Sequence, residues 1–358
     1  MSTKLRGVCL IPCLLFLTSL ALVSSIALAA PQQFPQFQYH LLRKIPLTGD
    51  GGWDYLTVDP AAKRIFISRA THVMVVDEDS GKVLGDIPDT KGVHGIALAR
   101  DLGLGFTSNG GANTVTFFDL AQFKPASVVD VGGMNPDSIL YDPATKRVFT
   151  FNGGSNNASA IDAMTGKLIG TVALPGKPET PVLDGKGSIF VNIEDKNQLV
   201  ELDTTTLKLT KSYPMAPCDS PSGIAMDTLN RRIFSGCRNK MMVIINADNG
   251  KLVAKSAIGA GADADAFDPG LELAFASCGE GVLSVIHEDT PEKFSVVGNF
   301  PTQTGARTMA LDPQTRHVFL VTADFKPADP PTPDNPRPRP QMVPGTFVLL
   351  ELAPSTNK

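Results

Sequence analysis

The sequence predicts an all-β protein built from seven copies of one structural repeat. Three observations lead to this prediction: one motif recurs along the chain, a turn ending in lysine recurs in phase with it, and helical periodicity is missing. After residue 30 no segment keeps an apolar period of about 3.6 residues over three turns, which an amphipathic helix requires. The 32 glycines and 28 prolines instead supply turns between short strands.

The repeated motif runs apolar-x-apolar-Asp-Pro and continues through a basic residue to an apolar residue and phenylalanine. Its Asp-type anchors follow one another at intervals of 40 to 44 residues, at Asp59, Ala99, Asp142, Asp184, Asp227, Asp268 and Asp312. A phenylalanine follows every anchor at a nearly constant distance, at Phe66, Phe106, Phe149, Phe190, Phe234, Phe275 and Phe319. A turn ending in lysine closes six of the copies, at Lys82, Lys124, Lys167, Lys208, Lys251 and Lys293. Three of these turns place glycine before the lysine, as tight hairpins with a positive φ require.

Each copy has room for four short strands, such as Arg64–Ser68 and Val73–Val76 in the first copy. A four-stranded unit of about 42 residues cannot bury both of its faces alone, so the copies must stack around an axis. We therefore predict a single seven-bladed β-propeller with four-stranded antiparallel blades over residues 39–354.

Closure of the ring follows from a missing strand. The last copy has candidate strands at Ala306–Leu311, Arg316–Val321 and Phe347–Leu352, but the chain ends before a fourth. The segment Tyr39–Pro46 resembles the fourth strands of other copies, such as Val83–Pro88. We predict that this N-terminal strand pairs with Phe347–Leu352, completes the last blade and protects its edge.

The repeat resembles the YVTN-repeat β-propellers, a family that includes the YncE-like exported proteins, over roughly residues 39–354. The tetrapeptide that names the family ends the second strand of each repeat, and Ile189-Phe190-Val191-Asn192 comes nearest to it here. Phenylalanine replaces the tyrosine throughout, and the asparagine occurs in one copy. The resemblance implies the propeller fold and a secreted context, and it implies little about chemistry.

Residues 1–29 have the layout of a secretory signal peptide, with a basic start, the apolar run Val8–Val23 and a small-residue end at Ala29. Residues 30–38 would then form a linker, and residues 355–358 a C-terminal tail. An uncleaved membrane anchor is the alternative, although the apolar run is short for a span of about 20 residues. We expect a periplasmic or secreted protein without a transmembrane segment in the mature chain.

The charge balance is mild, with 36 acidic and 32 basic residues and a net charge of -4. No cluster of lysine and arginine stands out along the chain, which argues against nucleic acid as a partner. We expect a monomer that binds a protein or a small-molecule ligand.

The mature chain would carry three cysteines, because Cys9 and Cys13 lie in the predicted signal peptide. Cys237 and Cys278 hold equivalent positions on adjacent blades, roughly 10 Å apart, whereas a disulfide needs its Cα atoms within about 7 Å. Cys218 lies in the loop that enters the blade of Cys237, so a Cys218–Cys237 disulfide with Cys278 free is favoured. A Cys218–Cys278 disulfide remains open, since loops can lean across a blade boundary.

The loops that enter the innermost strands should open on one face, at the mouth of the central channel. Five residues before each anchor the side chain is polar in every copy, and we call this set the mouth ring: Asp54, His94, Asp137, Glu179, Ser222, Asp263 and Arg307. Carboxylates that share a mouth raise one another's pKa values unless a cation or a basic ligand neutralises them. The mouth is therefore the expected binding site.

Three interpretations of the mouth ring stay open. Strand entrances beside a water-filled channel can be polar without any function. A metal or small ligand could bind, with these carboxylates as candidate ligands of a divalent cation: Asp54, Asp137, Glu179 and Asp263. In a catalytic site His94 would act as general base and Arg307 would polarise a carbonyl, although no nucleophile elbow, haem motif or His-x-x-x-His pair supports a particular reaction.

We therefore expect a non-catalytic exported propeller that binds a ligand or partner through the mouth face. The alternative is a metal-assisted hydrolase or lyase, similar to a lactonase, that uses the same mouth.

Asp265 departs from its equivalents, because the position two residues after the mouth ring is apolar in the other six copies. We expect a structural pair with Arg307, which begins the innermost strand of the next blade. A functional carboxylate is the alternative.

The segment Lys326–Gly345 holds eight prolines and interrupts the last blade between its second and third strands. Such a segment favours polyproline II structure, and here it should open on the mouth face. It could be a neutral insertion, a lid, or a partner-docking strip that carries Arg337 and Arg339.

Overall fold

The computed structural model describes residues 1–3, 37–49, 51–330, 332, 338 and 340–355. The chain divides into two units, Met1–Gln36 and Phe37–Lys358, and all described strands belong to the second. The predicted signal peptide, apart from its first three residues, lies outside the described residues, as do Arg337 and Arg339. No helix among the described residues has the length and apolar character needed to cross a bilayer.

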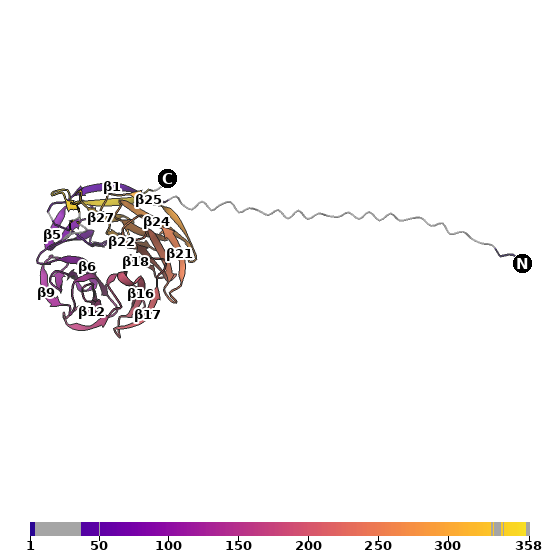
Figure 1. The fold of residues 1–358 in the computed structure, drawn as a ribbon, viewed down its shortest axis with the longest axis horizontal. Helices are drawn as coiled ribbons and strands as arrows, with labels where there is room; N and C mark the ends of the chain where they lie inside the picture. Colours follow the sequence, from indigo (N-terminus) through magenta and orange to yellow (C-terminus); the bar gives the residue numbers. More distant parts are fainter. Residues whose placement is uncertain (4–36, 50, 331, 333–337, 339, 356–358) are drawn as a thin grey trace. The chain divides into compact units, whose positions relative to one another are not determined.

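The described strands form seven four-stranded antiparallel blades around a central axis, together with one two-stranded hairpin (Figure 1). Blade 1 consists of β2 (Leu56–Asp59), β3 (Arg64–Arg69), β4 (His72–Asp77) and β5 (Val83–Ile87). Blade 2 consists of β6 (Val93–Ala99), β7 (Leu104–Asn109), β8 (Thr114–Asp119) and β9 (Pro125–Asp130). Blade 3 consists of β10 (Pro136–Asp142), β11 (Arg147–Asn152), β12 (Asn157–Asp162) and β13 (Leu168–Ala173). Blade 4 consists of β14 (Pro178–Leu183), β15 (Ser188–Ile193), β16 (Gln198–Asp203) and β17 (Lys208–Pro214).

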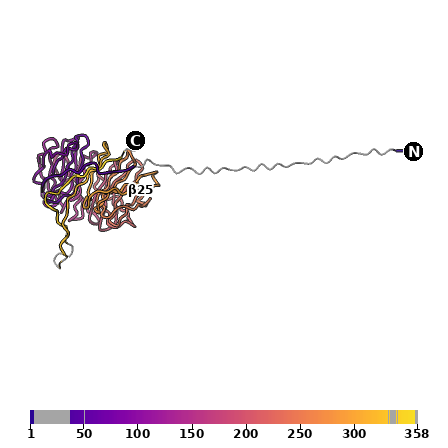
Figure 2. Tube along the Cα trace, turned by 90° about the horizontal axis from the view of Figure 1, so that it is seen from above, coloured from indigo at the N-terminus to yellow at the C-terminus, as the bar shows by residue number. Residues whose placement is uncertain are grey.

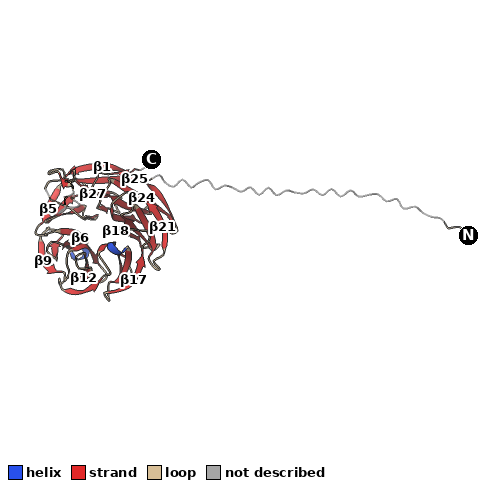
Figure 3. Cartoon of the chain, in the orientation of Figure 1, coloured by secondary structure: helices blue, strands red, loops and turns tan. Residues whose placement is uncertain are grey.

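Blade 5 consists of β18 (Pro221–Asp227), β19 (Arg232–Cys237), β20 (Met241–Asn246) and β21 (Leu252–Ala257). Blade 6 consists of β22 (Ala262–Asp268), β23 (Leu273–Cys278), β24 (Val282–Thr290) and β25 (Lys293–Pro301). Blade 7 consists of β26 (Met309–Leu311), β27 (Val318–Thr322), β30 (Val348–Ser355) and β1 (Gln38–Pro46), with the hairpin β28 (Phe325–Lys326) and β29 (Gln341–Met342) inserted after β27. Apart from two 3-10 turns of three residues each, the described residues form no helix (Figure 3). The all-β seven-bladed propeller predicted from the repeat is confirmed.

The repeated phenylalanine explains why the copies stack. All seven of these side chains have 0% exposure, and they lie in the apolar layers that the blades share. Burying one such ring stabilises the fold by roughly 1.5–3 kcal/mol, so one phenylalanine in each blade supports every interface of the ring. The anchor aspartates act locally, since Asp142, Asp227 and Asp312 each accept a backbone N–H from the turn that follows.

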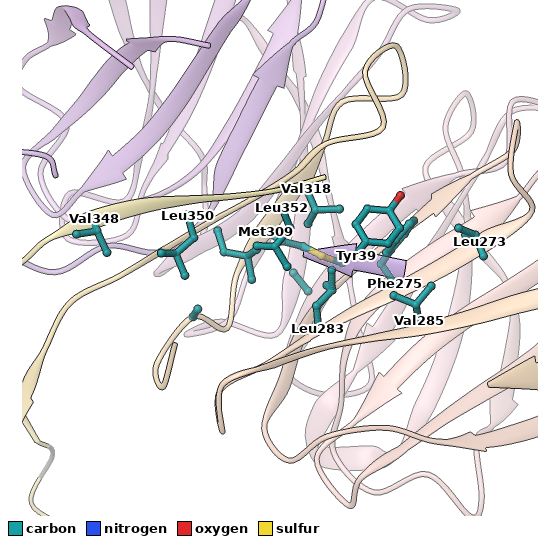
Figure 4. Close-up of a cluster of buried hydrophobic side chains, with 13 residues drawn as sticks. Tyr39, Leu273, Phe275, Leu283, Val285, Met309, Val318, Val348, Leu350 and Leu352 are labelled. Carbon is teal, nitrogen blue, oxygen red and sulfur yellow. The ribbon is translucent and has the colours of Figure 1, made fainter. Parts of the chain in front are cut away.

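The N-terminal strand closes the ring as predicted. β1 pairs antiparallel with β30 over its whole length, from Gln38 opposite Ser355 to Pro46 opposite Val348. Tyr39 is buried at 3% exposure and meets Phe275 of blade 6 edge to face at 5.2 Å, so β1 also contributes to the core between blades 6 and 7 (Figure 4).

Some predicted boundaries shift. β1 begins at Gln38 and β30 extends to Ser355, one residue beyond the predicted propeller at each end. The innermost strand of blade 7 is shorter than predicted and begins at Met309, because the preceding residues form a turn in which the Ala306 N–H donates to the carbonyl of Gln303.

Cys218 and Cys237 form a disulfide with a Cα–Cα distance of 5.6 Å, and Cys278 is a buried free thiol. This is the pairing that the blade geometry favours, because both cysteines belong to blade 5. The bridge ties the loop before β18 to the end of β19.

Replacing both Cys218 and Cys237 with alanine should lower the free energy of unfolding by about 3 kcal/mol, because the bridge spans 19 residues of chain. Chemical denaturation of the two proteins measures this loss. A Cys278→Ala variant is the control, and it should retain the bridge in non-reducing peptide mapping. Linkage of Cys278 in the wild-type map would contradict the assignment.

Candidate functional site

The mouth-ring residues lie at or just before the start of the innermost strand of each blade. Three of these strands, β6, β18 and β22, are labelled toward the centre of the ring in Figure 1. Side chains near the channel link neighbouring blades there. The Thr308 hydroxyl of blade 7 donates to the carbonyl of Asp54 in blade 1 at 2.7 Å, and the Ser138 hydroxyl of blade 3 donates to the carbonyl of Glu179 in blade 4 at 2.6 Å. These bonds hold the backbone of the mouth ring in a defined place.

The ends of the second strands supply further supports. Ser68 accepts the N–H of Asp54 at 2.9 Å, Ser108 donates to the carbonyl of Asp137, and Ser277 donates to that of Arg307. Asn192, the asparagine of the tetrapeptide, donates to the carbonyl of Ser222 at 3.1 Å. Polar residues at this repeat position therefore position the mouth ring.

Asp54, His94 and Asp137 form one cluster at the mouth, contributed by blades 1, 2 and 3. His94 Nδ1 lies 2.7 Å from Asp54 Oδ2 and 3.8 Å from Asp137 Oδ1. One ligand atom from each residue lies within 4.8 Å of the others, a spacing that could hold a metal ion. Two carboxylates and an imidazole suit a divalent transition metal better than Ca²⁺, which prefers oxygen ligands.

His94 has partners that favour its charged form. Burial alone would lower the pKa of His94, but hydrogen bonds with Asp54 and Asn135 and the charges of Asp54 and Asp137 outweigh it and raise the pKa. These partners therefore stabilise the protonated ring of His94. A metal ligand must be the neutral ring, so a metal at this cluster would compete with that proton.

Arg307 lies on the other side of Asp54. Its guanidinium bonds to Asp263, and one of its nitrogens lies 3.6 Å from Asp54 Oδ1. Asp263 also accepts the Ser222 hydroxyl at 2.9 Å. Six of the seven mouth-ring residues thus form one continuous chain of contacts: Asp137, His94, Asp54, Arg307, Asp263 and Ser222.

The expected Asp265–Arg307 pair is wrong. Asp265 Oδ2 instead accepts the backbone N–H of Gly236 at 2.5 Å, while Oδ1 is buried without a hydrogen-bond partner among the described residues. A Cβ atom at Gly223 or Gly236 would lie 2.7 Å from the Asp265 carboxyl. The carboxyl therefore occupies space that two glycines of blade 5 leave open, away from the guanidinium. Burial raises the pKa of Asp265 to about 8.

Glu179 forms a separate ion-pair group. Its carboxylate receives Lys177 Nζ at 2.5 Å, and the same ammonium lies 2.6 Å from Glu194. Arg238 reaches Glu194 at 2.9 Å. The predicted set of four metal-binding carboxylates therefore does not form one site, because Glu179 bonds to a lysine and Asp263 to an arginine.

The carboxyl groups at the mouth nevertheless hold protons more tightly than exposed acids do. Burial and the charge of Asp54 raise the pKa of Asp137 to about 6. Burial and a hydrogen bond with Glu194 raise the pKa of Glu179 above its ordinary range. Burial likewise raises the pKa of Asp263, although Arg307 opposes it. A bound cation would stabilise the charged forms of these carboxyl groups and so release protons.

Tyr55 is a site residue that the sequence reasoning missed. Its hydroxyl lies 3.5 Å from the Thr180 hydroxyl, which joins blade 1 to blade 4 across the channel. Burial, then the charges of the four mouth carboxylates, raise the pKa of Tyr55. The signal was available, because the other six copies have small residues at this position: Gly95, Ser138, Thr180, Gly223, Ala264 and Thr308.

The Pro-rich insertion begins beside the mouth. The ring of Phe325 lies 5.9 Å from that of Trp53, the residue before Asp54, and Gln303 donates to the Asp324 carboxylate at 3.0 Å. Figure 2 shows the described parts of this segment, in yellow, extending from one side of the ring. Its described base is therefore on the mouth face, as expected.

The fold and this site define the chain as a seven-bladed β-propeller with a charged channel mouth. Hydrazine synthase of Kuenenia stuttgartiensis matches with a TM-score of 0.68 and 16% identity, over 76% of this chain and 94% of that chain. A chain of the mitotic checkpoint complex matches with a TM-score of 0.69 and 14% identity, over 86% and 96% of the two chains. No protein-family model matches the sequence, and no curated protein does. At these identities the structural likeness supports the fold alone.

Proposed function

We propose that this chain is an exported, non-catalytic binding module, related to the YVTN-type propellers, that holds a ligand or partner at the channel mouth. The observation that carries the proposal is the contact chain from Asp137 to Ser222. The two basic side chains in this series of contacts, His94 and Arg307, are each bonded to a carboxylate, Asp54 and Asp263 respectively. The arrangement is a preorganised charged surface suited to recognition.

Export is supported by the signal-peptide layout of residues 1–29 and by the Cys218–Cys237 disulfide. Disulfides persist in oxidising compartments and are rare in the cytosol. The mouth would then face the periplasm or the medium.

The second candidate is a metal-assisted hydrolase or lyase. The convergence of Asp54, His94 and Asp137 favours it, because these three residues could hold a divalent ion. The ion would supply a Lewis acid, and the Arg307 guanidinium beside Asp54 could bind an anionic group of a substrate.

A thermal-shift screen of the mature protein against metabolites and millimolar Ca²⁺, Mg²⁺, Mn²⁺ and Zn²⁺ tests both candidates. Whatever binds the native state raises its melting temperature. We expect at least one compound or ion to stabilise the wild type and to lose this effect in Asp137→Asn. Asp86→Asn is the control, since Asp86 is an exposed acid on the outer strand β5.

The outcomes separate the candidates. Stabilisation without turnover of lactones or esters supports the binding module. Metal-dependent turnover that Asp137→Asn abolishes would support the enzyme. Equal stabilisation of both variants places the ligand elsewhere, and a complete lack of stabilisation contradicts small-ligand binding at the mouth.

A further inference from the structure

We call the interface between two neighbouring blades a seam. The seams differ in which side chain of the following blade faces the anchor aspartate. At three seams an arginine of the following blade meets the anchor: Arg100 bonds to Asp59, Arg231 lies 3.0 Å from Asp184, and Arg316 lies 3.9 Å from Asp268. Opposite charges face each other there, so these seams need no proton.

The seam that closes the ring has a different composition. Glu78 of blade 1 lies directly after β4 and meets the anchor Asp312 of blade 7. The equivalent positions of the other blades include one further glutamate, Glu288, and otherwise hold uncharged residues: Leu120, Ala163, Thr204, Ala247 and Pro354. A carboxyl group therefore faces a carboxyl group where the first and last blades meet.

The two carboxyls are buried and close together. Glu78 is 2% exposed and Asp312 is 0% exposed, and the Asp312 carboxyl lies within hydrogen-bonding reach of the Glu78 carboxyl. One Asp312 oxygen accepts the Gln314 N–H at 2.7 Å, while the other, like one oxygen of Glu78, receives no hydrogen from any described donor. Two carboxylates cannot donate, so a hydrogen bond between them exists only when the pair holds a proton.

The surrounding charges do not replace that proton. Lys63 Nζ lies 3.8 Å from one Glu78 oxygen and equally far from Asp79, and its side chain is 38% exposed. Arg43 of β1 donates to the backbone carbonyls of Glu78 and Asp79 and to the Glu351 carboxylate.

His317 of β27 accepts the Asp312 N–H with its backbone carbonyl, and its Nδ1 lies 2.7 Å from Glu351 Oε1. That carboxylate thus engages both His317 and Arg43, and neither cation is bonded to the Glu78 carboxyl.

We propose that the closing seam is a proton-dependent joint, in which Glu78 and Asp312 hold blades 7 and 1 together by sharing one proton. Loss of the proton leaves two buried anions facing each other and weakens the seam. Its apolar core includes Phe319, Phe347 and Leu56, which keep the blades in contact but contribute no pH dependence.

The electrostatics agree with this geometry. Burial, the hydrogen bond with Asp312 and its charge raise the pKa of Glu78 to about 7. At the interface of blades 5 and 6, burial and the charge of the anchor Asp227 raise the pKa of Glu288 to about 7. There one Glu288 oxygen accepts the Asn230 amide at 3.2 Å, so this pair has a side-chain amide donor, which Glu78 and Asp312 lack among the described residues.

The sign of the effect follows from linkage. The folded state keeps a proton that an unfolded glutamate releases near its ordinary pKa of 4.5. The stability contributed by the pair is complete below that value, declines as the pH rises towards about 7, and is absent above it.

Melting curves of the mature protein between about pH 5 and 9 test the joint, with Glu78→Gln as the main variant. A glutamine amide can donate to Asp312 at every pH, so the variant should melt about 3 °C above the wild type at alkaline pH and near it at acidic pH. Hydrogen exchange of β1 and β30, corrected for intrinsic rates, should show lost protection at alkaline pH in the wild type only. Asp312→Asn, which keeps the oxygen that accepts the Gln314 N–H, serves if the first variant does not fold.

Arg100→Gln is the matched control at an oppositely charged seam, and it should lower the melting temperature equally at both ends of the pH range. Parallel wild-type and Glu78→Gln curves would overturn the joint. Stabilisation of the wild type by millimolar Ca²⁺ at alkaline pH, absent in Glu78→Gln and present in Arg100→Gln, would also overturn it, because a cation would then occupy the place of the proton.

Discussion

A chain that begins at Thr48, and so lacks β1, should aggregate or melt far below the intact propeller. β1 supplies the fourth strand of blade 7, and its loss exposes the hydrogen-bonding edge of β30 over residues 348–355. It also removes Tyr39, which is 3% exposed, and Leu47, which is 4% exposed, together worth about 3–6 kcal/mol of apolar burial. Since natural domains are stable by only about 5–15 kcal/mol, we expect little folded protein at 37 °C.

The matched control is a chain that begins at Phe37, which keeps all of β1 and should melt like the mature protein. A synthetic peptide of residues 37–47, added in excess, should raise the melting temperature of the truncated chain by pairing with β30. Light scattering and circular dichroism measure both effects. A truncated chain that stays monomeric with an unchanged melting temperature would exclude closure by β1.

Replacing Asp265 with asparagine should stabilise the protein at neutral pH by at most about 4 kcal/mol. The folded protein binds a proton on Asp265 up to a pKa of about 8, whereas the unfolded chain releases it near 3.8. The stability contributed by this proton is complete below pH 3.8, declines as the pH rises and is lost above about 8. Asparagine keeps the bond to the Gly236 N–H and has no proton to lose.

The gain from Asp265→Asn should therefore be near zero at about pH 4 and largest above about pH 8. Asp263→Asn is the control two residues away, and it should destabilise the protein because it removes the carboxylate that pairs with Arg307. Urea titrations at several pH values give both differences. A lower stability of Asp265→Asn at alkaline pH would show that the carboxylate has a partner there.

The sequence alone determined the number of blades, their phase and the closing strand. Each copy buries one phenylalanine and has a hairpin turn at a fixed place. The phenylalanine recurs in all seven copies and the turn ending in lysine in six, so both can be counted along the sequence. For the same reason the sequence favoured the Cys218–Cys237 pairing, because strand position in a blade sets whether two Cα atoms come within reach of a disulfide, but it left Cys218–Cys278 open until the structure decided. Position in the repeat likewise located the mouth ring.

Only the tertiary structure decided which mouth residues contact each other. From its place in the repeat Arg307 could reach Asp263, Asp265 or Asp54. In the structure it bonds to Asp263, whereas the Asp265 carboxyl fills the space beside Gly223 and Gly236. Tyr55 meets Thr180 across the channel, a contact between residues 125 positions apart. Repeat position specifies the height of a side chain along the axis, but side-chain direction depends on packing between blades, which a single period does not encode.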